Sequence, residues 1–98
     1  MLFKSKKVQQ YIESGAVYVA TIRVCGIYEE GMRVKLRLVD SNRILDGRVV
    51  KIAELTEAEK YVNISGFDNV NEWFEEAKKL HGTENLDGYC IVVVRITR

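Results

Sequence analysis

The chain has 98 residues, of which 47% are hydrophobic and 30% charged, and its formal net charge is +1. A chain of this length folds as one domain, residues 1–98, and buries about 65% of its unfolded surface without disulfide or metal staples. The composition excludes a disordered chain, and the lack of any apolar run near the ~20 residues that cross a bilayer excludes a membrane-spanning helix.

The N-terminal segment predicts a short helix followed by a strand. MLFKSKKVQQ has no apolar stretch of the kind that marks a signal peptide, so we expect a cytoplasmic protein. From Ser5, a candidate N-cap, apolar residues fall at helical spacing as far as Gly15, which supplies a left-handed stop. AVYVATIRVC (16–25) follows as a strand rich in β-branched residues.

Two further segments predict strands. RVKLRLV (33–39) alternates apolar and basic residues, which places Val34, Leu36 and Leu38 inward and the basic residues outward. RILDGRVVKIAEL (43–55) is strand material that Asp46–Gly47 interrupts, either as a hairpin turn or as a bulge.

The second half predicts two helices and a closing strand. TEAEKYV (56–62) begins with Thr56 and Glu59 at capping-box spacing. The longest helix is expected over 69–81, capped by Asn69 or Asp68, with a core-facing stripe of Val70, Trp73, Phe74, Ala77 and Leu80. GYCIVVVRITR (88–98) is apolar on both alternations, which is typical of a central strand. The whole pattern predicts an α+β fold with a small, mostly antiparallel sheet of five or six strands, curled toward a barrel.

The cysteines and the histidine indicate no metal site. Cys25 and Cys90 each lie in an apolar run far apart in sequence, and we interpret them as buried free thiols rather than as a disulfide. His81 falls in the last turn of the longest helix, where a cation suits the helix dipole. With no cluster of Cys and His, we expect neither a metal nor a cofactor.

Charge is distributed unevenly along the chain. Residues 1–53 hold ten Lys and Arg against five Asp and Glu, whereas residues 54–98 hold five against nine. A basic half suits a phosphate-bearing partner, and an ordinary solvated surface is the equal alternative. Its candidate contact residues are Lys4, Lys6, Lys7, Arg23, Arg33, Lys35 and Arg37.

Several short motifs follow one another in a familiar order: ESGAVYVATIRV, YEEGMRVKL, RVVKIAELTEAE, GFDNVNEWFEEAKKLHG and GYCIVVVRI. Through them essentially the whole chain resembles the ASCH domain, a branch of the PUA-like superfamily. In that family they correspond to a helix ending in Gly, a strand with Thr-x-Arg, a Gly turn, a Leu-Thr-Glu helix start, a Gly-Phe pair before an amphipathic helix, and a closing strand. The resemblance implies a small PUA-like β-barrel flanked by two or three helices. It also implies a cleft between barrel and helices that binds RNA or a nucleotide.

Some bacterial relatives in that family are acetylcytidine amidohydrolases, and the resemblance locates their catalytic positions in this chain. Thr21 and Arg23 match the Thr-x-Arg motif. The lysine position falls on Val17 or Tyr18, and the carboxylate position falls near Ser65. An amide hydrolase needs an activated nucleophile and a group that moves protons, so the missing amine and acid predict a module without catalytic residues.

Pattern alone makes Thr21 and Arg23 the polar face of an ordinary strand, whereas the resemblance makes them the floor of a cleft. Arg23 would then hold a phosphate or a base edge with its forked guanidinium, Thr21 would add a hydrogen bond, and an exposed Tyr18 would stack on a base. The predicted nucleic-acid-binding residues are Tyr18, Thr21, Arg23, Ser65, Lys4, Arg33 and Lys35.

Three hypotheses for function follow. The first is an RNA- or nucleotide-binding module of the ASCH type that is not an enzyme. The second is a nucleoside-modifying enzyme with an altered catalytic set, and the third is a domain that binds a protein through its exposed sheet. The RNA target and the oligomeric state do not follow from the sequence.

Overall fold

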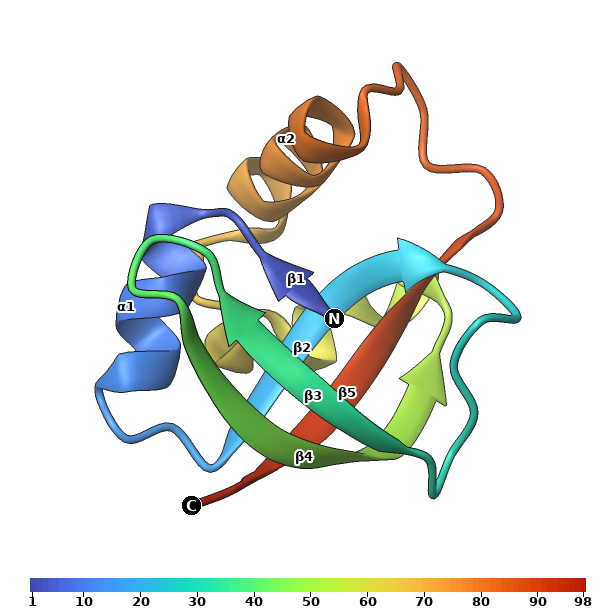
Figure 1. Ribbon diagram of the computed structural model, residues 1–98. Coiled ribbons are helices and arrows are strands. Elements are labelled where there is room, and N and C mark those ends of the chain that lie inside the picture. Colours follow the sequence, from blue (N-terminus) through green and yellow to red (C-terminus); the bar gives the residue numbers. More distant parts are fainter.

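The computed structural model describes residues 1–98 and contains one curled sheet with helices packed against it (Figure 1). In chain order the elements are β1 (Leu2–Phe3), α1 (Lys6–Glu13), β2 (Tyr18–Val24), β3 (Arg33–Leu38), β4 (Arg43–Ala53), the 3-10 helices η1 (Leu55–Lys60) and η2 (Val62–Ile64), α2 (Val70–His81) and β5 (Tyr89–Thr97). The predicted α+β class is confirmed, with a sheet of five strands. Neither α-helix is both long and apolar enough to cross a membrane.

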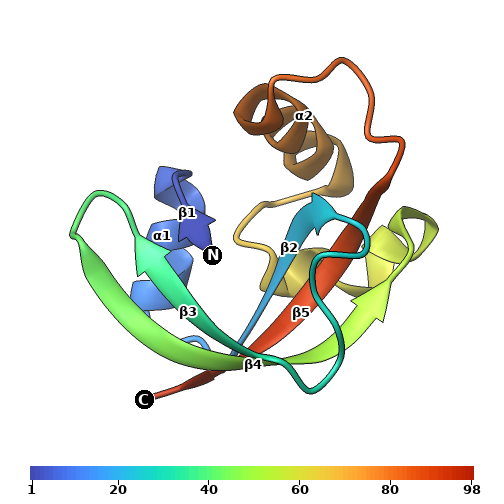
Figure 2. The ribbon, with the colours of Figure 1, turned by 45° about the vertical axis from the view of Figure 1, so that its right-hand side comes forward.

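The sheet has the strand order β1-β3-β4-β5-β2, which leaves β1 and β2 at its two edges. Strand β1 runs parallel to β3, and the other neighbouring pairs are antiparallel. Strand β5 lies between β4 and β2, so its predicted central position is confirmed. Because the sheet curls strongly, its edges turn back toward each other and the strands form an open half-barrel (Figure 2).

Two hydrophobic clusters lie on opposite faces of this sheet. Inside the half-barrel, α1 packs through Val8 and Ile12 against residues of β2, β3, β4 and β5. On the outer face, Trp73 and Ala77 of α2 lie in the second cluster with residues of β2, β5 and η1. Alternate residues of β5 enter the two clusters, which explains why this strand is apolar on both sides.

The predicted N-terminal caps of the two α-helices are confirmed. Ser5 Oγ accepts a hydrogen bond from the Val8 amide at 3.4 Å, and Asn69 Oδ1 accepts one from the Glu72 amide at 2.8 Å. Helix α2 is the longest helix, as expected, and ends at Gly82 in the left-handed conformation. Trp73 is only 3% exposed, whereas the predicted core residue Leu80 is 42% exposed. The apolar face of α2 therefore packs into the core only as far as Ala77, one turn before the helix ends.

The predicted interruption at Asp46–Gly47 is wrong, because β4 runs unbroken from Arg43 to Ala53. The irregularity in its pairing with β5 lies further along, between Val49 and Lys51. Gly47 serves close packing instead of a turn, since a Cβ there would lie 2.7 Å from side-chain carbons of both Leu36 and Val94.

The predicted capping box of Thr56 and Glu59 is also wrong. The helix is of the 3-10 type, begins at Leu55, and has no side-chain hydrogen bond at its N-cap, Glu54. This short segment buries Ala58 in the outer cluster, so packing against the sheet fixes its conformation.

The two cysteines form a disulfide, which corrects the expectation of free thiols. The antiparallel register sets Arg23 opposite Cys90, and Cys25 lies two residues beyond Arg23 on the diagonal. The two Cα atoms are 5.2 Å apart, within the range that a disulfide requires. A sequence separation of 65 residues conceals this proximity, because it arises only when β2 and β5 pair.

Candidate functional site

A cavity of about 410 Å³ lies where the half-barrel is open. One wall of the cavity comes from β1 and the start of α1, and the other wall comes from α2. Residues Ala20 to Arg23 of β2 also line the cavity. Because β2 is an edge strand, side chains from both of its faces reach the cavity. Its volume is within the range of pockets that hold small ligands.

Arg23 is the central polar group of this cavity. Its Nε donates to Thr21 Oγ1 at 3.0 Å, and its Nη2 donates to the carbonyl oxygen of Leu2 at 2.6 Å, which ties the two sheet edges together. The guanidinium carbon lies 4.9 Å from the ring centre of Phe3. The bond to Thr21 confirms that the two side chains share one face, as their spacing predicts.

The guanidinium of Arg23 has no carboxylate partner. All five ion pairs of the structure use a lysine as the cation, and none includes an arginine. Arg23 is partly buried, and burial lowers the pKa of its guanidinium while the nearby Tyr28 opposes that shift. An arginine nevertheless keeps its charge in a protein, and only two of its five N–H groups are bonded here. The cavity therefore offers a desolvated cation with free donors.

Other cavity groups add positive charge and aromatic surface. The exposed residue Lys4 lines the cavity, and so does Met1, whose α-amino group donates to the Lys35 carbonyl oxygen at 2.9 Å. Burial, and then repulsion by Arg23, lowers the pKa of that amino group. Four aromatic residues line the walls: Phe3, Tyr28, Phe67 and Trp73.

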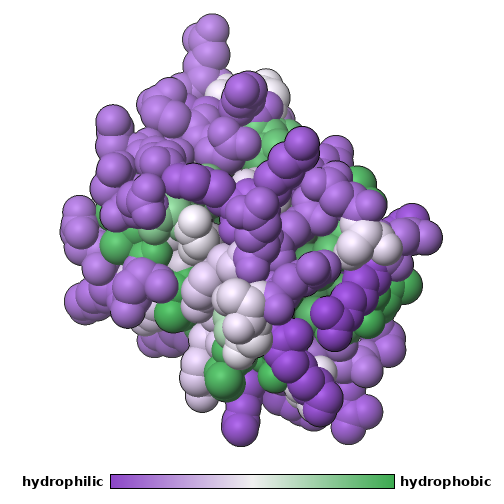
Figure 3. Space-filling view, turned by 90° about the vertical axis from the view of Figure 1, so that its left-hand side faces the viewer, coloured by the Kyte–Doolittle hydropathy of each residue, from purple (hydrophilic) through white to green (hydrophobic).

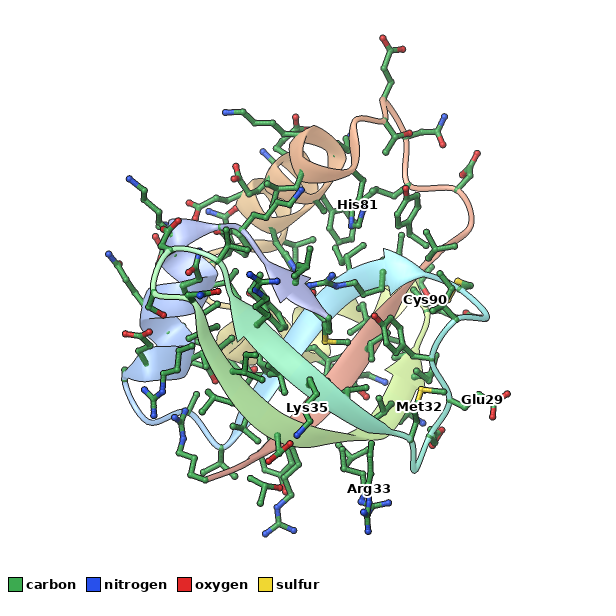
Figure 4. The ribbon with its side chains drawn as sticks, in the orientation of Figure 1. Glu29, Met32, Arg33, Lys35, His81 and Cys90 are labelled. Atoms are coloured by element: carbon green, nitrogen blue, oxygen red, sulfur yellow. A yellow bond between two sulfur atoms is a disulfide. The ribbon has the colours of Figure 1, made fainter.

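Helix α2 contributes two groups that the sequence did not single out for the site, Glu76 and His81. His81 points from the helix end toward β2 (Figure 4) and donates from Nε2 to the carbonyl oxygen of Ile22 at 3.0 Å. Its ring also lies 4.8 Å from that of Tyr89. A lone histidine and one glutamate on an amphipathic helix carry no local signal of a site, because only the tertiary fold places α2 over the edge of β2.

Four of the seven predicted binding residues line this cavity: Lys4, Thr21, Arg23 and Ser65. Ser65 is fully buried, and its hydroxyl donates to Val62 O at 2.6 Å and accepts from the Phe67 amide at 3.1 Å. Both hydrogen bonds of its hydroxyl therefore stay within the wall of the cavity.

The other three predicted residues lie outside the cavity. Tyr18 is at the far end of β2 from Arg23, so the expectation that it shares this cleft is not met. Arg33 and Lys35 extend from β3 on the side of the sheet away from α2 and His81 (Figure 4). Lys35 forms an ion pair there with Asp46. The even spacing that puts basic residues outward on β3 also directs them away from the interior of the half-barrel.

The structure shows neither a cluster of metal ligands nor, on the side of α1, a large hydrophobic patch. No group of three or more His, Cys, Asp or Glu side chains is placed to hold a metal ion. Seen from the side of α1, the surface is mostly hydrophilic with small separate hydrophobic patches (Figure 3).

Comparison with known proteins gives a match that covers nearly the whole chain. "Uncharacterized protein 105" of Sulfolobus islandicus rod-shaped virus 1 is 40% identical over 99 residues, which cover 98% of this chain and 92% of the viral protein. The chain belongs to the family of this viral protein. No protein-family model matches the chain, and no solved structure matches it. Because the match extends over nearly the whole of both chains, we expect this viral family to share the half-barrel and its cavity.

Proposed function

We propose that this protein is an ASCH-type, PUA-like module that binds RNA or a nucleotide in the cavity at the opening of the half-barrel. The observation that carries the proposal is the guanidinium of Arg23, which faces a cavity and has no carboxylate partner. Removing such a cation from water is costly unless an anion compensates its charge, and phosphate and carboxylate are the anions that a forked guanidinium binds with two parallel hydrogen bonds.

The composition of the cavity supports a nucleotide over a bare anion. Tyr28 and Phe67 line the cavity and are only half-buried, so they provide aromatic surface, and a nucleotide joins a flat base to a phosphate. The resemblance to the ASCH domain adds support, because it assigns Thr21 and Arg23 to a cleft between barrel and helices.

The single tryptophan makes the proposal testable without a label. Trp73 is the only tryptophan of the chain and lines the cavity, so a nucleotide that enters should change its fluorescence. The titrant is cytidine or uridine 5′-monophosphate at low salt. Arg23→Ala should weaken binding by about 10- to 150-fold, because it removes a charge-assisted contact of about 1.5–3 kcal/mol.

Two variants control for effects on folding and on total charge. Arg23→Lys keeps the charge and loses the fork, so its affinity should fall between those of wild type and Arg23→Ala. Lys35→Ala removes one positive charge on the opposite side of the sheet and should leave the affinity unchanged. If Arg23→Ala melts like wild type and binds the nucleotide equally well, the cavity is not the site.

A second candidate function is hydrolysis of a modified nucleoside such as acetylcytidine. The observation that favours it is the presence of Glu76 and His81 in the same cavity as Thr21, which could replace the missing family lysine and carboxylate. We expect no hydrolysis, because the Thr21 hydroxyl accepts its hydrogen bond from a cation rather than giving its proton to a base. Turnover of acetylcytidine that disappears in both Thr21→Ala and Glu76→Gln would favour this candidate.

A further inference from the structure

The outer face of the sheet is covered along only part of its length. The helices η1, η2 and α2 cover the outward residues Ala20 and Ile22 of β2 and Ile91 and Val93 of β5. At the next outward position the cover ends, and Tyr18 and Arg95 are exposed.

Three arginines lie side by side at that position. The strand register places Arg33 of β3 opposite Arg48 of β4, and Arg48 opposite Arg95 of β5. These three residues, here called the arginine row, are all exposed, and Tyr18 of β2 continues the row as the partner of Arg95. Directly opposed residues of an antiparallel pair project to the same face, so the four side chains form one line across the sheet.

This line is electrostatically unfavourable for the folded chain on its own. Like charges directly opposite each other in a sheet are destabilising, and Arg48 has one on each side. No carboxylate offsets them, because none of the ion pairs includes an arginine and the neighbouring Asp46 is held by Lys35. Among their side chains only that of Arg48 makes a hydrogen bond, to the carbonyl oxygen of Gly31 at 2.7 Å.

We infer that the arginine row binds the phosphate backbone of single-stranded RNA, and that Tyr18 stacks on one of its bases. Strands lie about 4.8 Å apart, so the four side chains span about 14 Å, a length that reaches several successive phosphates of one strand. An exposed aromatic ring at the end of a basic row is the arrangement that favours single strands, because only unpaired bases are free to stack. This surface is separate from the cavity, and Figure 4 shows Arg33 and Lys35 pointing away from His81.

The test measures the anisotropy of a fluorescein-labelled twelve-residue oligouridylate over a range of salt concentrations. The triple variant Arg33→Gln, Arg48→Gln, Arg95→Gln should bind more weakly, with a slope of log K against log salt smaller by about 2, or about 0.7 for each lost phosphate contact. The matched control, Lys60→Gln, Lys78→Gln, Lys79→Gln, removes the same charge from the acidic half and should change the slope by less than half as much.

Single variants separate binding from folding. Arg95→Glu should weaken binding while its melting temperature stays at or above that of wild type, because the new carboxylate faces Arg48. Tyr18→Ala should lower the affinity about five-fold or more with little change in the salt slope. All of these variants leave Arg23 and the cavity intact, so the result does not depend on nucleotide binding there.

The inference would be overturned if the row variant and the lysine control lost affinity equally. No binding of the oligonucleotide by wild type at about 50 mM salt would also overturn it and favour a protein partner for this face. Tighter binding of a duplex of the same length, unaffected by Tyr18→Ala, would contradict the single-strand assignment.

Discussion

The disulfide between Cys25 and Cys90 should make a large contribution to stability. It closes a loop of 65 residues, and the chain-entropy treatment assigns such a loop about 4 kcal/mol of stabilisation through the unfolded state. Measured values are often smaller than this, so we expect Cys25→Ala, Cys90→Ala to lower the free energy of unfolding by about 2–4 kcal/mol. For a chain of this size that corresponds to a decrease of roughly 10–20 °C in Tm.

Urea unfolding followed by circular dichroism measures this loss directly. Wild type in a strong dithiol reductant should unfold like the double variant, whereas the double variant itself should be insensitive to the reductant. Thiol titration in denaturant provides the independent check, since protein purified without reductant should have no free thiol. Two titratable thiols, or a double variant within 0.5 kcal/mol of wild type, would refute the reasoning.

Three further substitutions test the packing. Trp73→Ala should cost roughly 3–5 kcal/mol in urea unfolding, the usual loss for a large core aromatic, and a loss below 1 kcal/mol would mean that α2 is not anchored by this ring. Gly47→Ala should destabilise by about 1–3 kcal/mol, because its Cβ would meet Leu36 and Val94 at 2.7 Å; an unchanged Tm would show that β4 has room there. Asn69→Ala removes the cap of α2 and should cost about 1 kcal/mol, with Asn69→Asp as the variant that keeps the stability.

The elements that could be predicted from sequence are those whose signals are local. Asn69 and Gly82 mark the ends of α2, and the apolar spacing between them identifies its buried face. The alternation of β3 and the unbroken apolar run of β5 likewise indicate an outer strand face and a central strand. For the site, the spacing of Thr21 and Arg23 was enough to place both side chains on one face.

What could not be predicted depends on which strands become neighbours. The disulfide, the cavity and the arginine row all arise from the strand order β1-β3-β4-β5-β2, which no single segment specifies. Gly47 shows that a local signal can also mislead, because Asp-Gly strongly predicts a turn where the structure has a continuous strand. Close packing against Leu36 and Val94 accounts for the glycine instead.

The central claim is that a phosphate-bearing nucleotide binds beside Arg23, and amide chemical shifts in a ¹⁵N-labelled protein test it most directly. Titration with cytidine or uridine 5′-monophosphate should shift the indole N–H of Trp73 and the amides of Thr21 and Arg23, and the unphosphorylated nucleoside should do so much more weakly. No shift at these positions, or shifts confined to Arg48 and Arg95 on the outer face, would contradict the assignment of the cavity.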